Sequence, residues 1–158
     1  MKTIRMRRCV SGFVGAIVIL LQISPALAGS APDNPPRPIV ITFTKWITGF
    51  PLMAGFVGGD VAGDFAGEVL QFQEIGNGRV VRLEAIYEVQ AGERSFTALV
   101  RGAQNNEAGR AILNGVIQSG WRTGARVHVE YEVLTDCAGA PAGLCFQGTI
   151  RVQRPSRN

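Results

Sequence analysis

Two stretches of this chain alternate between apolar and polar residues. Residues 80–89 read VVRLEAIYEV and residues 125–134 read ARVHVEYEVL. In the second stretch the polar positions are Arg126, His128, Glu130 and Glu132. A period of two residues places alternate side chains on opposite faces of a β-strand. Each stretch is therefore predicted to be a strand with one buried face and one polar face.

Short β-favouring runs recur along the chain, separated by turn residues such as Asn77-Gly78, which favour hairpins. The other runs lie at 39–46, 64–72, 95–102, 110–118 and 145–152, and residues 47–63 could hold a further short strand and a loop. No segment of ten residues or more shows a convincing period of 3.6 residues. The pattern predicts an all-β fold: one antiparallel, up-and-down-like barrel of seven to eight strands over residues 39–152.

The first residues are typical of a secretory signal peptide. A basic head precedes an apolar run of 13 residues, and the segment ends in Ala26-Leu27-Ala28 after Pro25. A membrane anchor is the alternative, but a spanning helix needs ~20 apolar residues. We expect cleavage after residue 28, a secreted or periplasmic location and no membrane span after cleavage. Residues 29–38, which hold four prolines, are expected to form a linker, and residues 153–158 a flexible tail.

Removal of residues 1–28 changes the charge balance. The whole chain has 16 basic and 12 acidic residues, and the first 28 contain four of the basic ones, so 12 of each remain. A formally neutral chain has no basic stripe with which to neutralise phosphates. Nucleic acid is therefore not expected as a partner.

Two cysteines, Cys137 and Cys145, remain after that removal, and an even number in an exported chain favours a disulfide. A redox pair or a metal site is the alternative. Redox pairs usually have C-x-x-C spacing, and zinc needs four ligands where the chain offers two cysteines and one histidine. We expect a structural disulfide, no metal and no cofactor.

The polar face of residues 125–134 has two interpretations. It is the solvated face of a strand, or it lines the lumen of the barrel, where Glu130 or Glu84 could act as a general base and His128 as an acid. Burial would cost several kcal/mol per unpaired charge. The solvated interpretation is therefore favoured.

Other residues could line a small-molecule pocket, because such pockets combine apolar walls with a few polar groups. Glu68 is the one acid in a strongly apolar strand, although strand alternation favours an outward position for it. The candidates for ligand binding are Trp46, Glu68, Phe96, Asn114 and Trp121.

A resemblance to a known family of barrels extends over residues 39–152. It rests on the segments AGDFAGEVL, AIYEV, SFTALVRGAQN and AILNGVIQSGWRTGARVHVEYEV. Their glycine pattern includes Gly63-x-Phe65-x-Gly67 and the start of a strand at Gly124-Ala125-Arg126. In these features the chain resembles the allene oxide cyclase and dirigent-like barrels, which are calycin-type β-barrels. The resemblance implies an eight-stranded antiparallel barrel that binds an apolar small molecule, and in some members steers a cyclisation or coupling.

Three functions follow from these patterns. The first is an exported barrel that binds an apolar small molecule or lipid in its lumen. The second is a cyclase or isomerase that uses Glu68, Glu84 or Glu130 near the pocket. The third is a structural or interaction protein of the cell envelope, with the apolar segment 47–59 as its contact surface. Neither the ligand nor the oligomeric state follows from the sequence.

Overall fold

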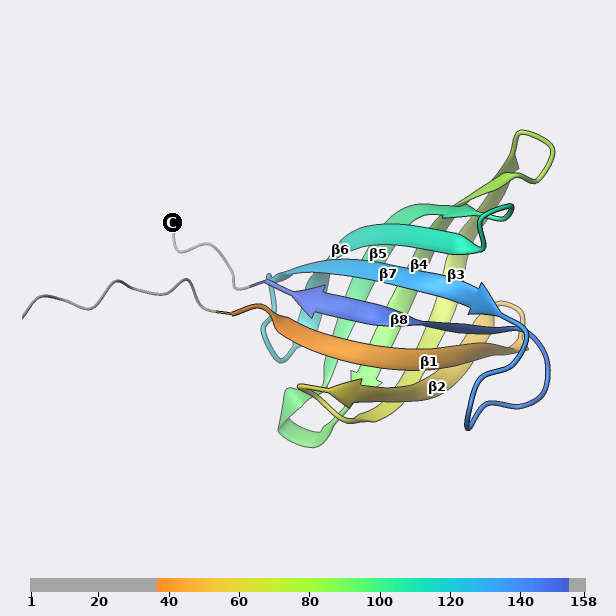
Figure 1. Ribbon diagram of the computed structural model, residues 1–158. Coiled ribbons are helices and arrows are strands. Elements are labelled where there is room, and N and C mark those ends of the chain that lie inside the picture. Colours follow the sequence, from red (N-terminus) through yellow and green to blue (C-terminus); the bar gives the residue numbers. More distant parts are fainter. Residues whose placement is uncertain (1–36, 154–158) are drawn as a thin grey trace, which may run out of the picture. The chain divides into compact units, whose positions relative to one another are not determined.

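The computed structural model describes residues 37–153 (Figure 1). They form eight strands and one short 3-10 helix. The strands are β1 (Ile39–Gly49), β2 (Leu52–Gly59), β3 (Gly63–Ile75), β4 (Val80–Gln90), β5 (Phe96–Asn105), β6 (Arg110–Gly120), β7 (Arg126–Leu134) and β8 (Cys145–Val152), and the 3-10 helix η1 is Gly92–Arg94. The predicted signal peptide, nearly all of the linker and residues 154–158 of the tail lie outside the described residues.

The eight strands form a closed antiparallel barrel in sequence order, which confirms the predicted fold class. Each strand pairs with its neighbours along the chain, and β1 closes the barrel by pairing with β8, from Ile39 opposite Val152 to Trp46 opposite Cys145. The eighth strand is β2, which the 47–63 region supplies. Closure leaves no sheet edge around the body of the barrel.

Four connections meet at one end of the barrel, which we call the open end. They join β1 to β2, β3 to β4, β5 to β6 and β7 to β8 (Figure 1). In the β3–β4 hairpin, β3 continues to Ile75, three residues beyond the predicted run, and its turn uses positive φ angles at Asn77 (56°) and Gly78 (80°). Asparagine and glycine adopt this conformation most readily, which is why the dipeptide marked the turn correctly.

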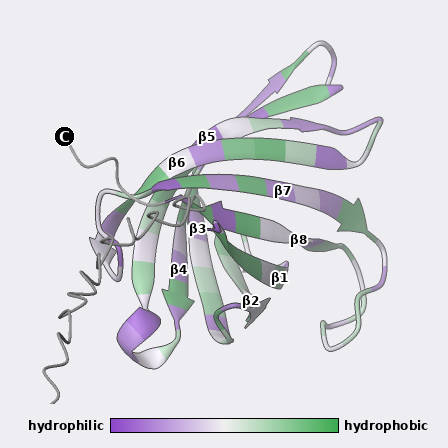
Figure 2. Ribbon diagram, turned by 60° about the vertical axis from the view of Figure 1, so that its left-hand side comes forward, coloured by the Kyte–Doolittle hydropathy of each residue, from purple (hydrophilic) through white to green (hydrophobic). Residues whose placement is uncertain are grey.

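The alternation along β7 separates a buried face from a solvated one. Val127, Val129 and Tyr131 are buried, whereas Arg126 and Glu132 are exposed. The same arrangement occurs along β4, and Figure 2 shows the resulting alternation of hydrophobic and hydrophilic bands along the strands. The favoured interpretation of the polar face is therefore confirmed, since it faces solvent and not the lumen.

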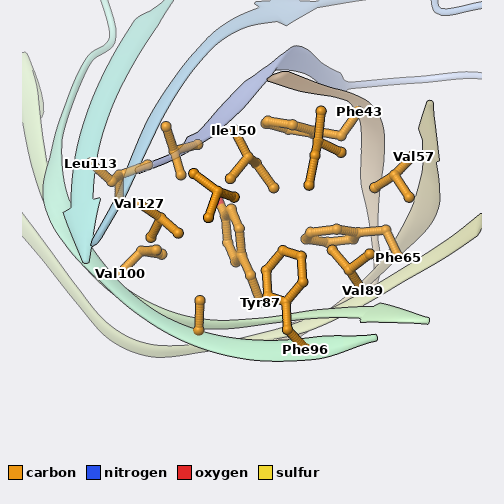
Figure 3. Packing of buried hydrophobic residues seen from close by; sticks show 14 of the residues in the cluster. Phe43, Val57, Phe65, Tyr87, Val89, Phe96, Val100, Leu113, Val127 and Ile150 are labelled. Carbon is orange, nitrogen blue, oxygen red and sulfur yellow. The ribbon is translucent and has the colours of Figure 1, made fainter. Parts of the chain in front are cut away.

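Aromatic side chains fill the middle of the barrel. The ring of Phe43 lies 6.0 Å from that of Phe65, and the ring of Tyr87 meets Phe65 edge-on with 5.0 Å between centroids. These three side chains point into the interior together with aliphatic residues of other strands, such as Leu113 of β6 and Ile150 of β8 (Figure 3). The middle of the lumen is thus packed with side chains.

Glycines on the inner face allow neighbouring strands to approach closely where the barrel bends. A Cβ at Gly148 would lie 2.0 Å from the carbonyl oxygen of Glu130, and a Cβ at Gly55 would lie 2.1 Å from that of Thr44. No side chain fits such a gap, so these positions require glycine. Glycine kinks of this kind let a sheet curl into a small barrel.

The predicted disulfide joins Cys137 in the β7–β8 loop to Cys145 at the start of β8, with 6.2 Å between their Cα atoms. Both residues are buried. The bond ties a loop rich in alanine and glycine to the sheet beside the open end.

Replacement of both cysteines by serine should lower the free energy of unfolding by about 2.5 kcal/mol, the value of the chain-entropy model for so short a loop. Urea denaturation of the double variant and of the parent measures the difference. Thr135→Ser, in the same loop, serves as a control that should change little. Equal stability of the parent with and without reductant would contradict this prediction.

Candidate functional site

One charged side chain is buried inside the barrel. Lys45 lies on β1, on the inward face with Ile41 and Phe43, and its exposed fraction is 3%. It is one of only two lysines in the sequence, the other being Lys2. Apart from one histidine, all other basic residues are arginines. A lysine is therefore unusual in this chain, and a buried one more so.

Aromatic rings and a hydroxyl surround the amine. Lys45 Nζ donates a hydrogen bond to the hydroxyl oxygen of Tyr87 and lies 3.6 Å from the sulfur of Met53. The nearest ring centroids belong to Tyr87, at 4.3 Å, and Tyr131, at 4.7 Å. The rings of Phe43, Phe65 and Phe146 also lie within 6 Å of the nitrogen. Ring faces attract a cation, but they replace only part of its hydration.

No carboxylate of residues 37–153 forms an ion pair with Lys45. Burial therefore dominates and lowers the pKa of Lys45 from 10.5 to about 7. At neutral pH about half of the molecules carry an uncharged amine at this position.

The two tyrosines beside the amine respond to burial in the opposite direction. Burial, with a smaller effect of Tyr131, raises the pKa of Tyr87 well above its usual value, and burial also raises the pKa of Tyr131. Both hydroxyls therefore keep their protons at neutral pH. Tyr131 donates its proton in a 2.9 Å hydrogen bond to Oε1 of Gln104.

A cavity of about 140 Å³ extends from Lys45 to the open end. Phe50 and Phe72 form its mouth, where their rings meet edge-on at 6.1 Å and their exposed fractions are 66% and 51%. Apolar side chains make up most of the wall, and the polar residues on it are Lys45, Tyr87, Tyr131 and Gln104. An apolar cavity of ~150 Å³ is large enough to hold a benzene ring.

None of the five ligand-binding candidates from the sequence lines this cavity. Trp46 lies on the outer face of β1, its ring 6.3 Å from that of Phe56. Glu68 is exposed on β3, and Asn114 is exposed on β6. Phe96 is buried at the opposite end of the barrel with Trp121, 6.5 Å between ring centroids. The five side chains are not brought together, because strand parity and position along the barrel separate them.

The residues proposed for acid–base chemistry lie on the outer face. His128 has Nδ1 2.8 Å from Oδ1 of Asn114 and Nε2 3.0 Å from Oε1 of Glu130. The hydrogen bond with His128, followed by the charge of Arg151, lowers the pKa of Glu130, which makes it a weaker base. This row is a solvated network of the kind that contributes little to stability.

Glu84 and Glu68 are also unsuited to chemistry in the lumen. Glu84 forms a 2.9 Å ion pair with Arg101, its cross-strand neighbour on β5, and Glu68 is exposed on the outer face of β3. None of the three glutamates therefore lines the cavity beside Lys45, because the period of two turns all three acids outward. Glu130 instead borders a larger hollow on the outer face.

A larger hollow of about 760 Å³ lies over the outer face of the sheet, from β6 through β7, β8 and β1 to β2. Its rim includes side chains that face solvent, such as Thr42, Ile112 and Glu132. Tyr131 is the one buried titratable residue that borders it, but its hydroxyl lies on the luminal side, where it is bonded to Gln104. The smaller cavity is the better candidate, because it combines a buried amine with an apolar wall.

Residues 37–153 contain no cluster of three or more His, Cys, Asp or Glu side chains that could bind a metal ion. Within the same residues no helix has the length and apolarity needed to cross a membrane. The chain matches no protein-family model, no curated protein and no solved structure. The resemblance to allene oxide cyclase and dirigent-like barrels therefore stays a prediction.

Lys45 is not among the site residues predicted from the sequence. The signal was present in the segment ITFTKWIT, where a period of two places Lys45 on the same face as Ile41 and Phe43. A lysine on the apolar face of a strand is rare enough to mark a site.

Proposed function

We propose that this chain is an exported β-barrel protein that binds an apolar small molecule through its open end, with a polar group of the ligand at Lys45. The observation that carries the proposal is an apolar cavity with a single buried amine at its inner end. Such an amine costs folding free energy, and a ligand that hydrogen-bonds to it recovers part of that cost.

Export is supported by two features. The N-terminal segment has the pattern of a signal peptide, and Cys137 and Cys145 form a disulfide, which persists in oxidising compartments. The buried position of both cysteines fits a structural role for the bond.

The size of the cavity limits the ligand. A single ring or a short branched chain fills about 140 Å³, and a longer molecule must leave through the mouth between Phe50 and Phe72. The exposed aromatic rings at this mouth offer apolar surface to that part of a ligand. We therefore expect compact apolar ligands with one hydrogen-bonding group.

Filling the cavity should abolish binding. Ala85 is buried on the cavity wall, so Ala85→Leu adds three carbon atoms to the space that the ligand needs. Ala103→Leu, on the exposed face of β5, is the matched control. Benzyl alcohol, which carries the expected hydrogen-bonding group, should stabilise the parent and Ala103→Leu by about 2.7 kcal/mol at one hundred times Kd, measured as a higher melting temperature. Toluene, which lacks that group, should stabilise both proteins less at the same concentration.

The same ligands should leave Ala85→Leu unchanged. If neither compound stabilises the parent up to its solubility limit, the binding proposal is wrong. If both compounds stabilise Ala85→Leu as much as the parent, the ligand site lies elsewhere.

The two other hypotheses lack a specific observation. A cyclase or isomerase would have to use Lys45, Tyr87 or Tyr131, since the glutamates point outward. The exposed Phe50 and Leu52 of the 47–59 segment belong to the rim of the open end, where a binding protein also needs apolar surface.

A further inference from the structure

We propose that Lys45 forms a reversible imine with an apolar aldehyde bound in the cavity. The inference rests on the proposed function, because the aldehyde must first enter through the open end. It names the chemical class of the ligand and gives Lys45 a covalent role.

Geometry makes Lys45 the nucleophile of the cavity. Its Nζ lies among the residues that line the space, and the wall carries no second amine, thiol or carboxylate. With no anion to hold a proton on it, the amine has its lone pair free in a large fraction of molecules at neutral pH. Desolvated lysines of this kind are activated for attack on carbonyl groups.

The reaction balances with the groups present. The lone pair of Nζ attacks the carbonyl carbon of the aldehyde, and the π electrons of the C=O bond move to oxygen. A proton passes from nitrogen to that oxygen and gives a carbinolamine. The C–O bond then breaks as a second proton leaves nitrogen, so one aldehyde and one amine yield one imine and one water. No oxidant or reductant takes part.

Tyr87 is placed to assist these proton transfers. Its hydroxyl is hydrogen-bonded to Nζ, so it lies close to any oxygen on the carbon that Nζ attacks. Because burial keeps this hydroxyl protonated, it can donate a hydrogen bond to the carbinolamine oxygen. Tyr131, whose ring is 4.7 Å from Nζ, keeps bulk water away from the imine on another side.

An aldehyde suits the cavity better than a carboxylic acid. A carboxylate paired with Lys45 would bury two charges, each of which costs several kcal/mol to desolvate. An aldehyde and a neutral amine bury none, and the resulting imine also stays uncharged in an apolar site. The ion pair is the competing outcome that the experiment must separate.

Lysine labelling is easy to assign in this chain, because Lys45 and Lys2 are its only lysines. The full chain is incubated with trans-cinnamaldehyde at pH 7 and reduced with borohydride, and peptide mass spectrometry locates the product. The expected product at Lys45 is heavier by the mass of the aldehyde minus one oxygen atom. The absorbance of the conjugated aldehyde should shift before reduction.

The matched control moves the lysine to the surface. Lys45→Met combined with Arg82→Lys places an amine of ordinary pKa on the exposed face of β4 and keeps the same number of lysines. We expect at least about tenfold less product at position 82 than at Lys45 of the parent, because only the neutral amine attacks. Tyr87→Phe should still form the product at Lys45, more slowly.

The outcomes separate this inference from the proposed function. Equal labelling at position 82 and at Lys45, or no labelling at Lys45, overturns the imine. If toluene and benzyl alcohol still stabilise the protein in that case, the binding site stands without covalent chemistry. If hexanoate stabilises the parent but not Lys45→Met, the amine serves as an ion-pair partner. If no compound binds, both proposals fail.

Discussion

Lys45→Met should make the barrel more stable at pH 6, by roughly 3–5 kcal/mol. The upper value follows from the fall in the pKa of Lys45 from 10.5 to about 7, at 1.36 kcal/mol per unit. Methionine fills a similar volume without a charge, and apolar replacements of buried charges are often stabilising. Urea denaturation of the two proteins measures the difference.

The pH dependence of the parent's free energy of unfolding tests the same burial cost independently. Between pH 7 and 10 the unfolded chain holds the Lys45 proton and the folded chain does not, so stability rises with pH across this window. Between pH 6 and pH 9 the parent should gain roughly 2–3 kcal/mol relative to Lys45→Met. Below about pH 6 both states bind the proton, and the difference should be constant.

Arg82→Met, on the exposed face of β4, is the control for removal of a positive charge and should give neither effect. A parent whose stability relative to Lys45→Met does not change between pH 6 and 9 would show that Lys45 is solvated. A strongly destabilised Lys45→Met would show that the ammonium is held by partners stronger than the rings and the hydroxyl.

Phe43→Ala should lower the free energy of unfolding by about 3–5 kcal/mol, as is usual for a fully buried phenylalanine. Phe43 is 2% exposed and contacts Phe65, Tyr87 and Tyr131 with ring centroids 6.0–6.3 Å apart. It connects both sides of the lumen, so its loss leaves a void that no neighbour can fill. Urea denaturation is again the measurement.

Thr42→Ala is the matched control, because Thr42 is the exposed neighbour of Phe43 on the same strand. It should change stability by less than about 0.5 kcal/mol. Similar effects of the two substitutions would contradict the assignment of the inner and outer faces of β1.

The strands followed from the sequence wherever a period of two was complete. In β4 and β7 every ionic position is outward and nearly every apolar one is inward, Ile86 being an exception in β4, so both strand and face were evident. In β2 the pattern was weaker because Gly55 occupies an inward position between Met53 and Val57. Glycine there serves the close approach of β1, a requirement of barrel closure that local pattern does not reveal.

The site could not be found from residue types alone. Trp46 and Asn114 are of the kinds that bind ligands, but strand parity places both on the outer face. The period of two in β1 already turns Lys45 inward, but its partners are defined only by the register of β1, which places Gly55 on one side of it and Phe146 on the other. The aromatic rings around it come from strands far apart in the sequence, so the closed topology creates the site.

The buried amine is a large cost for a domain of this size. Domains typically have 5–15 kcal/mol of stability, and a penalty of several kcal/mol is a substantial share of it. Positions where a chain violates its own pattern in this way tend to be functional. Lys45 is such a position, and the proposed chemistry uses the property that burial gives it.

Nuclear magnetic resonance titration of the Lys45 side chain tests the central claim most directly. With isotope-labelled lysine the chain gives signals from Lys45 and Lys2 alone, and Lys45→Met assigns them. We expect one Cε–Hε signal to titrate with a pKa of about 7. Two signals that both titrate near pH 10.4, the value of a solvated lysine, would contradict the account.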